Sequence, residues 1–216
     1  VLSVVLSFAL DKDLIKTHPA HKLRLKRGGG NEEPWQREEI AAFCAKARER
    51  GRPSIRLAAL LMAGLGQRQG DVLRLSRSRY DPAAGTFDIV QNKRGRRVLI
   101  PVVPELREAI EATPVSSPTL VISEETGRPY KATDFRYQFR RIADAAGLPR
   151  SRKSMTLRHT MASMLGEAGC TESEVVSILG NLPEIARKHY IRPSSAMAER
   201  AIGRLTAART KRLTDD

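Results

Sequence analysis

The chain has 216 residues and a mass of 24.0 kDa, which suits one good-sized domain, or one domain and part of another. Lys and Arg number 38 against 24 Asp and Glu, so the net charge is +14 and we expect a polyanionic partner, with nucleic acid as the first candidate. Because 41% of the residues are hydrophobic and 29% are charged, the composition is that of a folded protein and excludes a disordered one.

The two cysteines, Cys44 and Cys170, lie far apart in the sequence, and neither has the spacing of a metal site or a disulfide framework. We therefore expect no metal site and a reducing compartment. The apolar run Val1 to Leu10 lacks a basic start and a cleavage site and is too short to span a bilayer. We expect neither a signal peptide nor a membrane partner.

The first elements along the chain are a helix and a basic linker. Apolar residues at helical spacing predict a helix over about residues 1–15, which ends before the Pro19 region. The stretch Lys22 to Gly30 is basic and glycine-bearing, as expected of a linker that lies along a polyanion. A domain boundary near residue 30 follows. Since the chain begins with Val and not Met, we expect residues 1–30 to be the end of a domain that starts upstream.

The rest of the chain alternates helical patterns with one β-hairpin. Pro34 to Arg50 predicts an amphipathic helix and Pro53 to Gly64 a buried one. Period-two alternation over 86–90 and 97–100, with Gly95 between, predicts the hairpin. Further helices are predicted over 104–112, 133–146, 156–168, 171–180, 183–190 and 196–213. The expected fold is mainly α with a small antiparallel β-sheet (α+β).

Five motifs stand in a fixed order along this pattern. They are GLGQRQGDVLRL with Arg68, the turn Lys93-Arg94-Gly95-Arg96, Leu157-Arg158-His159-Thr160, Leu179-Gly180-Asn181 and Tyr190. A lone arginine at a helix start is more often only a solvated charge. Together, however, the motifs resemble the catalytic domain of tyrosine recombinases of the phage integrase family, over about residues 31–205.

The resemblance implies a site-specific recombinase or integrase that cuts and rejoins duplex DNA through a 3′-phosphotyrosyl bond. By this resemblance Tyr190 is the nucleophile, Arg68 and Arg158 bind the phosphate, and Lys93 is the general acid. The attack by a tyrosine keeps the bond energy for rejoining, so no metal or nucleotide cofactor is expected.

Two positions depart from the family pattern. Met155 stands where a histidine is expected, three residues before Arg158, and Asn181 replaces a histidine or tryptophan. A methionine cannot donate a hydrogen bond to a phosphate oxygen or accept the proton of a tyrosine, whereas an asparagine still donates. We therefore expect a weakened or conditional enzyme. The alternative is a DNA-binding relative whose cutting site has decayed. A third interpretation, a type IB topoisomerase, fits the Leu-Gly motif and the compact hairpin less well.

Basic residues in three segments are predicted to contact the DNA backbone. They are Lys22, Arg24, Lys26 and Arg27, then Arg74, Arg77 and Arg79, and finally Arg150, Arg152 and Lys153. Aromatic residues make up only 5% of the chain, which favours duplex DNA over a stacked single strand.

The resemblance also implies a domain division and an assembly. Residues 1–30 would be the end of a truncated core-binding domain and its linker, and residues 31–216 the catalytic domain with a C-terminal tail. The tail either packs onto a neighbouring protomer or folds back on its own domain. The expected assembly is a homotetramer on paired DNA sites, in the cytoplasm of a bacterium and associated with the nucleoid.

Overall fold

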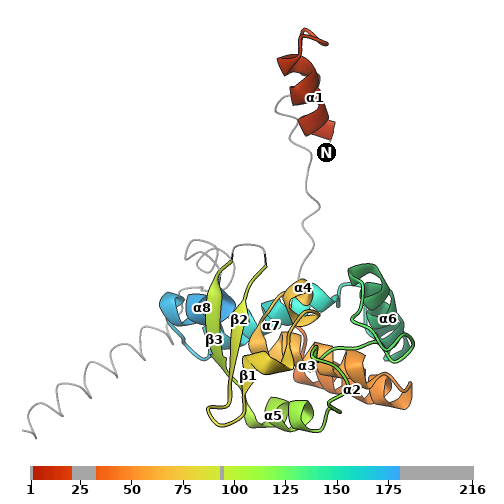
Figure 1. The fold of residues 1–216 in the computed structure, drawn as a ribbon, viewed down its shortest axis with the longest axis vertical. Coiled ribbons are helices and arrows are strands. Elements are labelled where there is room, and N and C mark those ends of the chain that lie inside the picture. The colour runs from red at the N-terminus through yellow and green to blue at the C-terminus, as the bar shows by residue number, and fades with distance from the viewer. Residues whose placement is uncertain (1, 21–32, 93–94, 181–216) are drawn as a thin grey trace, which may run out of the picture. The chain divides into compact units, whose positions relative to one another are not determined.

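The computed structural model describes residues 2–20, 33–92 and 95–180. The chain divides into two units, Val1–Asn31 and Glu32–Asp216 (Figure 1). No helix in the described parts of the chain is both long enough and apolar enough to cross a membrane. The predicted helices over 183–190 and 196–213 lie outside the described residues, as does the basic linker stretch 22–30.

Helix α1 (Leu2–Asp11) is the helix of the first unit, and it is shorter than the predicted 1–15. The helix ends because Asp13 takes a left-handed conformation, with φ of 54°, and the backbone N–H of Leu14 donates to the carbonyl of Ala9. The segment that follows turns back, and the His18 ring lies 3.1 Å from the Ser3 carbonyl oxygen. The apolar periodicity therefore continues past the end of the helix itself.

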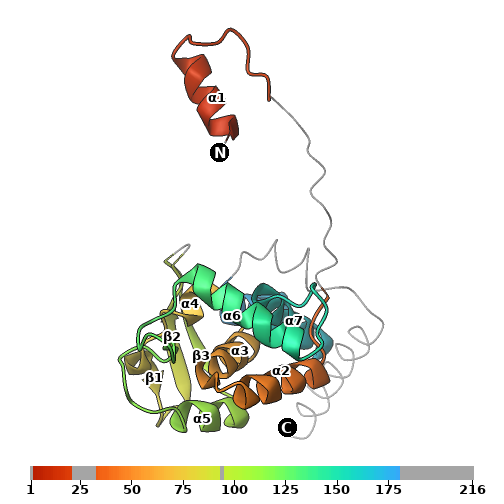
Figure 2. The ribbon, with the colours of Figure 1, turned by 90° about the vertical axis from the view of Figure 1, so that its right-hand side faces the viewer.

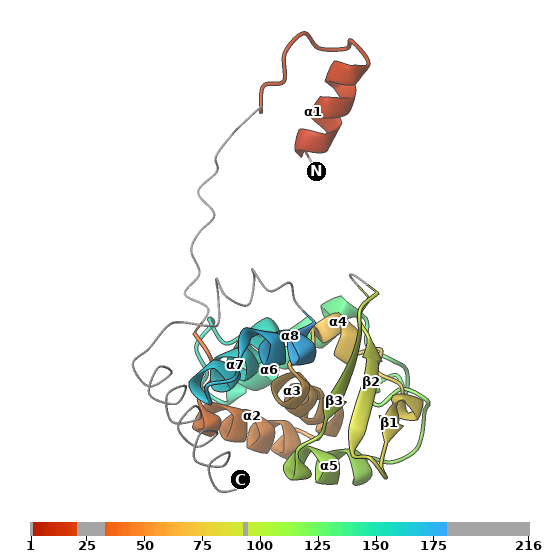
Figure 3. The ribbon, with the colours of Figure 1, turned by 90° about the vertical axis from the view of Figure 1, so that its left-hand side faces the viewer.

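Helix α3 (Pro53–Leu65) is the centre of the second unit, as Figures 2 and 3 show. It packs against the five helices named next, and Ile55, Leu61, Met62 and Leu65 are completely buried. The helices around it are α2 (Arg37–Glu49), α4 (Gln69–Val72), α5 (Pro104–Glu111), α6 (Ala132–Ala145) and α7 (Ser154–Glu167). The last described helix, α8 (Glu172–Leu179), packs on α7 and on strand β3.

A three-stranded antiparallel sheet covers one side of the second unit, in the order β1 (Tyr80–Asp81), β2 (Thr86–Val90) and β3 (Arg97–Pro101) (Figure 3). In the β2–β3 register Phe87 pairs with Ile100 and Ile89 with Val98, and all four side chains are buried. The predicted hairpin and the mainly α fold class with a small antiparallel sheet are confirmed. Strand β1 and the 3₁₀ turn Arg77–Arg79 before it were not predicted, because two residues are too few to show a period.

The segment that enters the second unit is anchored to α7 by Trp35. The Trp35 backbone N–H donates to the Thr160 hydroxyl at 2.8 Å, and its indole N–H donates to the Thr156 hydroxyl at 2.7 Å. The indole also packs edge-on against Phe43 and Phe139. Helix α2 begins at Arg37, later than the predicted Pro34, because Trp35 is held in this extended anchor and Gln36 is the extended N-cap residue.

A second anchor joins α2 to the segment before α7. The Arg152 guanidinium is almost fully buried, and its Nε lies 2.9 and 2.8 Å from the two carboxylate oxygens of Glu39. Burial alone raises the pKa of the Glu39 carboxyl. The hydrogen bonds from Arg152 and from the Gln36 backbone N–H, with the charge of Arg152, outweigh burial and hold that pKa below the ordinary value of 4.5.

We predict that Glu39→Gln lowers the free energy of unfolding by about 1 to 3 kcal/mol at neutral pH, because it leaves Arg152 with a weaker partner. A lowered carboxylate pKa contributes stability above the unfolded value, and this stability is lost as pH falls through the folded value. The difference in the free energy of unfolding between Glu39→Gln and wild type should therefore shrink below pH 4.5. Urea unfolding at several pH values measures it, with the exposed neighbour Glu38→Gln as the control. A pH-independent difference would contradict the ion pair.

Candidate active site

Arg68 lies at the sharp turn between two helices. Helix α3 stops at Gly66, which has a left-handed φ of 61°, and Arg68 is the N-cap residue of α4. A Cβ on Gly66 would lie 2.6 Å from a Leu179 methyl carbon, so the turn needs glycine for its φ and for this close approach. The half-buried Arg68 guanidinium donates from Nη1 to Gln91 Oε1 at 3.3 Å. The turn thus fixes the backbone of Arg68, and Gln91 holds its guanidinium.

Arg158 reaches the same place from α7. Its side chain is 5% exposed, and its two terminal nitrogens donate to the carbonyl oxygens of Gly66 and Leu179, both at 2.8 Å. These carbonyls close the last turns of α3 and α8, where helix geometry leaves acceptors without a partner. Arg158 therefore holds the two helix ends together, and it lines the same cavity as Arg68.

Arg68 and Arg158 line one cavity of about 500 Å³ between α4, α6 and α7. Every charged side chain on the walls that the structure describes is a cation: Arg68, Arg136, Arg140, Arg152, Lys153 and Arg158. Arg152 is paired with Glu39, and Arg140 donates to the carbonyls of Leu148, Pro149 and Arg152. A concave surface lined by one sign of charge concentrates anions. The cavity is suited to a phosphate group.

Met155 stands on the first turn of α7 and lines this cavity together with Arg158. The expected histidine position is thus on the side of α7 that lines the cavity, as is Arg158. The Met155 side chain is 59% exposed, so solvent or a ligand reaches it. Its thioether offers only a weak acceptor to a ligand in the cavity.

Several predicted site residues lie outside the described residues: Lys93, Asn181, Tyr190, Lys22, Arg24, Lys26 and Arg27. The structure describes the chain on both sides of Lys93, up to Asn92 and from Gly95. It also describes Gly180, directly before Asn181. Asn92 is held by its backbone N–H, which donates to the Asp71 carboxylate at 2.9 Å. The hairpin base and the end of α8 thus both lie near Arg68.

The predicted DNA-contacting residues of 74–79 have different surroundings. Arg74 is exposed and lies 3.8 Å from the Asp71 carboxylate, while Arg79 and Arg97 both pair with Asp88. Arg77 donates to the carbonyls of Thr113 and Pro114 and so ties down a loop. Arg74 and Arg79 line one small pocket together with Asp71 and Asp88, whereas Arg77 does not line it.

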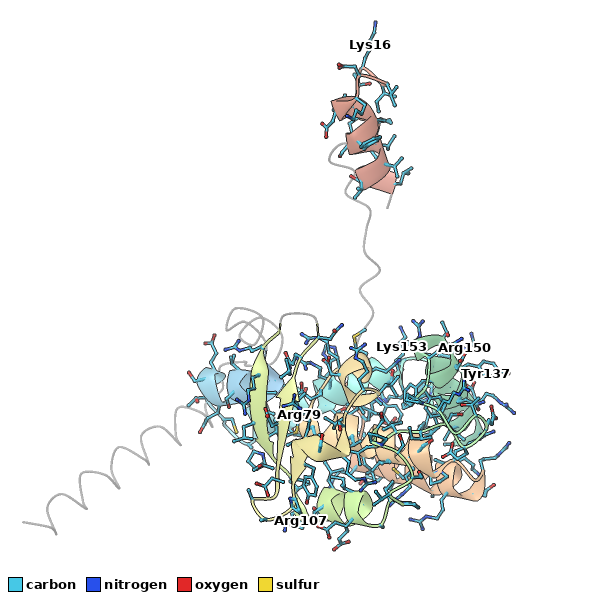
Figure 4. All side chains as sticks on the ribbon, in the orientation of Figure 1. Lys16, Arg79, Arg107, Tyr137, Arg150 and Lys153 are labelled. Atoms are coloured by element: carbon cyan, nitrogen blue, oxygen red, sulfur yellow. The ribbon has the colours of Figure 1, made fainter. Side chains whose placement is uncertain are left out.

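The 150–153 segment is closer to the cavity. Arg150 and Lys153 are exposed, and Figure 4 shows both where α6 gives way to α7, on the opposite side of the unit from Arg107 of α5. Lys153 lines the cavity, whereas Arg152 between them is buried in its ion pair and has little surface left for a phosphate.

The sequence analysis missed Arg136 and Arg140, which bring α6 into the cavity wall. Their spacing of four residues on a predicted helix was the available signal, because it places both on one face. It also missed the buried amides Gln67 and Gln91, which are 1% and 0% exposed. Within the described residues, no cluster of His, Cys, Asp and Glu could hold a metal ion.

Residues 33–195 match the family model described as Phage integrase family. The chain belongs to the phage integrase family. A comparison of the sequence with curated proteins found no match.

Solved integrase structures share the fold. A lambda integrase dimer bound to a COC′ core site has a TM-score of 0.71 at 20% identity, and the match covers 88% of this chain and 56% of that one. The Tn1549 transposon integrase in complex with a circular intermediate DNA has a TM-score of 0.75 at 15% identity, with 94% and 76% covered. XerA recombinase has a TM-score of 0.62 at 15% identity, with 79% and 64% covered. This phage integrase family member thus spans little more than half of the lambda integrase chain, and its mainly α fold is that of a tyrosine recombinase catalytic domain.

Proposed function

We propose that this chain is the catalytic part of a site-specific recombinase or integrase that cuts and rejoins duplex DNA through a 3′-phosphotyrosyl intermediate. The observation that carries the proposal is the cavity shared by Arg68 and Arg158, whose charged walls are all cationic where the structure describes them. Membership of the phage integrase family supports it. A DNA phosphodiester is the anion that this chemistry requires.

Each residue has a defined role in the proposed reaction. The Tyr190 hydroxyl oxygen attacks the phosphorus atom and gives up its proton to water, the bond to the 5′ oxygen breaks, and Lys93 gives that oxygen a proton. Negative charge grows on the two non-bridging oxygens in the transition state, where Arg68 and Arg158 stabilise it as planar, permanently charged donors. Attack by the free 5′ hydroxyl reverses the steps, so the tyrosyl ester stores the energy for rejoining. The mechanism needs no metal or nucleotide cofactor.

The local structure supports these roles for the two arginines. Both guanidiniums are held by hydrogen bonds to fixed partners: Arg68 to Gln91, and Arg158 to the ends of α3 and α8. Fixed donors stabilise developing charge without the cost of reorienting during the reaction. Arg136 and Lys153 extend the positive surface outward from this pair.

We further propose that the protein acts on duplex DNA as a homotetramer on paired sites, with residues 1–30 as the end of a core-binding domain. A related structure is a lambda integrase tetramer bound to a Holliday junction, with a TM-score of 0.68 at 20% identity and 55% of that chain covered. The net charge of +14 supports a DNA partner.

A second candidate function is DNA binding without cutting. The observation that favours it is Met155, an exposed thioether on the cavity wall where the family pattern has a histidine. Asn181 at the other histidine or tryptophan position retains an amide donor. The recombinase proposal therefore includes a slowed chemical step, and the two candidates are separated by whether a covalent adduct forms at all.

We predict that Tyr190→Phe abolishes covalent adduct formation and leaves DNA binding nearly unchanged, because only the hydroxyl can form the phosphoryl ester. The assay uses a nicked duplex that carries an end of the protein's own element, and it detects the adduct by denaturing gel electrophoresis. An adduct in the phenylalanine variant would identify another nucleophile. No adduct with wild type, together with tight binding, would favour the second candidate.

We predict that Lys153→Ala lowers duplex affinity and reduces the slope of log K against log salt by about one, since it removes one phosphate contact. Arg107→Ala removes the same charge from α5, on the opposite side of the unit in Figure 4, and should leave the slope unchanged. Fluorescence anisotropy over a salt series measures both. Equal slopes for the two variants would place the DNA elsewhere.

We predict that Met155→His speeds cleavage by about 10- to 1,000-fold, because it restores a donor and a proton acceptor beside Arg158. Asn181→His should give a smaller gain, and the two gains should not add, since both groups act on one transition state. Single-turnover cleavage by wild type, both variants and the double variant is compared at equal DNA occupancy. If the variants cleave no faster and wild type is inactive, the site has decayed. If the variants cleave no faster and wild type is active, another group fills the histidine's role.

A further inference from the structure

Gln91 stands at the point where the parts of the site join. It follows strand β2, two residues before Lys93, and its side chain is completely buried. Its backbone closes the hairpin turn, because its N–H donates to the Arg96 carbonyl and its own carbonyl accepts from the Gly95 N–H, both at 2.8 Å. The position of Gln91 therefore sets the base of the turn that carries Lys93.

The Gln91 side chain makes three hydrogen bonds to the surrounding site. Oε1 accepts from Arg68 at 3.3 Å, and Nε2 donates to Gln67 Oε1 at 2.6 Å and to the Leu179 carbonyl at 2.8 Å. Arg158 donates to this same Leu179 carbonyl. One buried amide thus connects the turn of Arg68, the hairpin and the end of α8.

A second buried amide, Gln67, fixes the hydrogen-bond directions of Gln91. It is 1% exposed, and its Nε2 donates to the carbonyls of Leu65 and Ile178, both at 2.9 Å. These donors leave its Oε1 to accept from Gln91. The directions of the hydrogen bonds are therefore fixed, and Gln91 must present its oxygen to Arg68.

The end of α8 is shaped around Gln91. Gly180 has a left-handed φ of 63°, and a Cβ at this position would lie 2.6 Å from the terminal nitrogen and oxygen of Gln91. Only a residue without a side chain admits the amide this close to the backbone. Gly180 directly precedes Asn181 in the sequence, so Gln91 lies against the last described residue before that predicted site position.

We infer that Gln91 is a positioning residue for strand cleavage, which orients the Arg68 guanidinium and ties the base of the β2–β3 hairpin to the end of α8. The inference rests on the proposed function. An amide suits this place because its oxygen accepts from Arg68 without cancelling the positive charge, while its nitrogen donates to two buried acceptors. A carboxylate would neutralise Arg68 and could not donate, and a thioether would be a weak acceptor for Arg68 and could not donate to Gln67.

The test compares Gln91→Met, Gln91→Glu and the milder Gln67→Met with wild type. Tyr130→Phe is the control, because it removes a half-buried hydroxyl that bonds Ser54 and Glu124 near the start of α3. At saturating nicked duplex, both Gln91 variants should cleave about 10- to 100-fold more slowly while the DNA dissociation constant stays the same. Gln67→Met should slow cleavage less than the Gln91 variants do, and Tyr130→Phe should cleave at the wild-type rate. Melting temperatures identify any variant that does not fold.

A second measurement does not need cleavage. The Arg68 guanidinium is observed by ¹⁵N NMR without DNA and assigned by its loss in Arg68→Lys. Removal of the Gln91 acceptor should speed rotation of the Arg68 Nη groups, whereas Tyr130→Phe should leave that rotation rate unchanged.

Each outcome decides one question. A folded Gln91→Glu that cleaves at the wild-type rate, or an unchanged Arg68 signal in the folded Gln91 variants, overturns the inference. Equal slowing by Tyr130→Phe would show a general loss of stability and overturns it as well. If wild type forms no adduct, the proposed function fails, and the NMR arm alone decides whether Gln91 orients Arg68.

Discussion

The carbonyl groups at the C-terminal ends of α3 and α8 are the constraint on which the site depends. Both helices stop at left-handed glycines in the interior, where water cannot reach the last carbonyls. Arg158, Gln67 and Gln91 supply the missing donors. Burying a polar group without a partner costs more free energy than a hydrogen bond contributes, so these donors stabilise the two helix ends. The same contacts that satisfy the helix ends bring the two arginines to one cavity.

The sequence predicted most of the elements because local chemistry decided them. Pro53 opens α3, and alternation identified β2 and β3, whose register then placed Phe87 and Ile100 inward. The order of motifs, with Arg68 and Arg158 among them, pointed to one site, and both line one cavity. The buried glutamines were missed because an amide near a turn has the same sequence signal whether it is solvated or buried. Only contacts between residues far apart in sequence, such as Gln91 with Leu179, distinguish the two.

The basic segments show a similar limit. Within 150–153, Lys153 lines the cavity, whereas Arg152 forms an ion pair with Glu39, which lies more than a hundred positions earlier in the chain. Sequence gives the charge of a segment, but the fold decides which of its charges are already neutralised. Where the chain enters the second unit, Trp35 donates hydrogen bonds to α7 and Glu39 pairs with Arg152 of this segment. The entry of the chain is thus hydrogen-bonded directly to the helix that carries Arg158.

The cavity that the structure describes also has a simple hydrogen-bonding character. Its charged walls are five guanidiniums and one ammonium, and such groups donate hydrogen bonds but accept none. With Met155 in the expected histidine position, these walls hold no imidazole that could act as an acceptor. A ligand held here therefore meets charged groups that only donate, so the walls favour an anion with several acceptor oxygens, such as a phosphate.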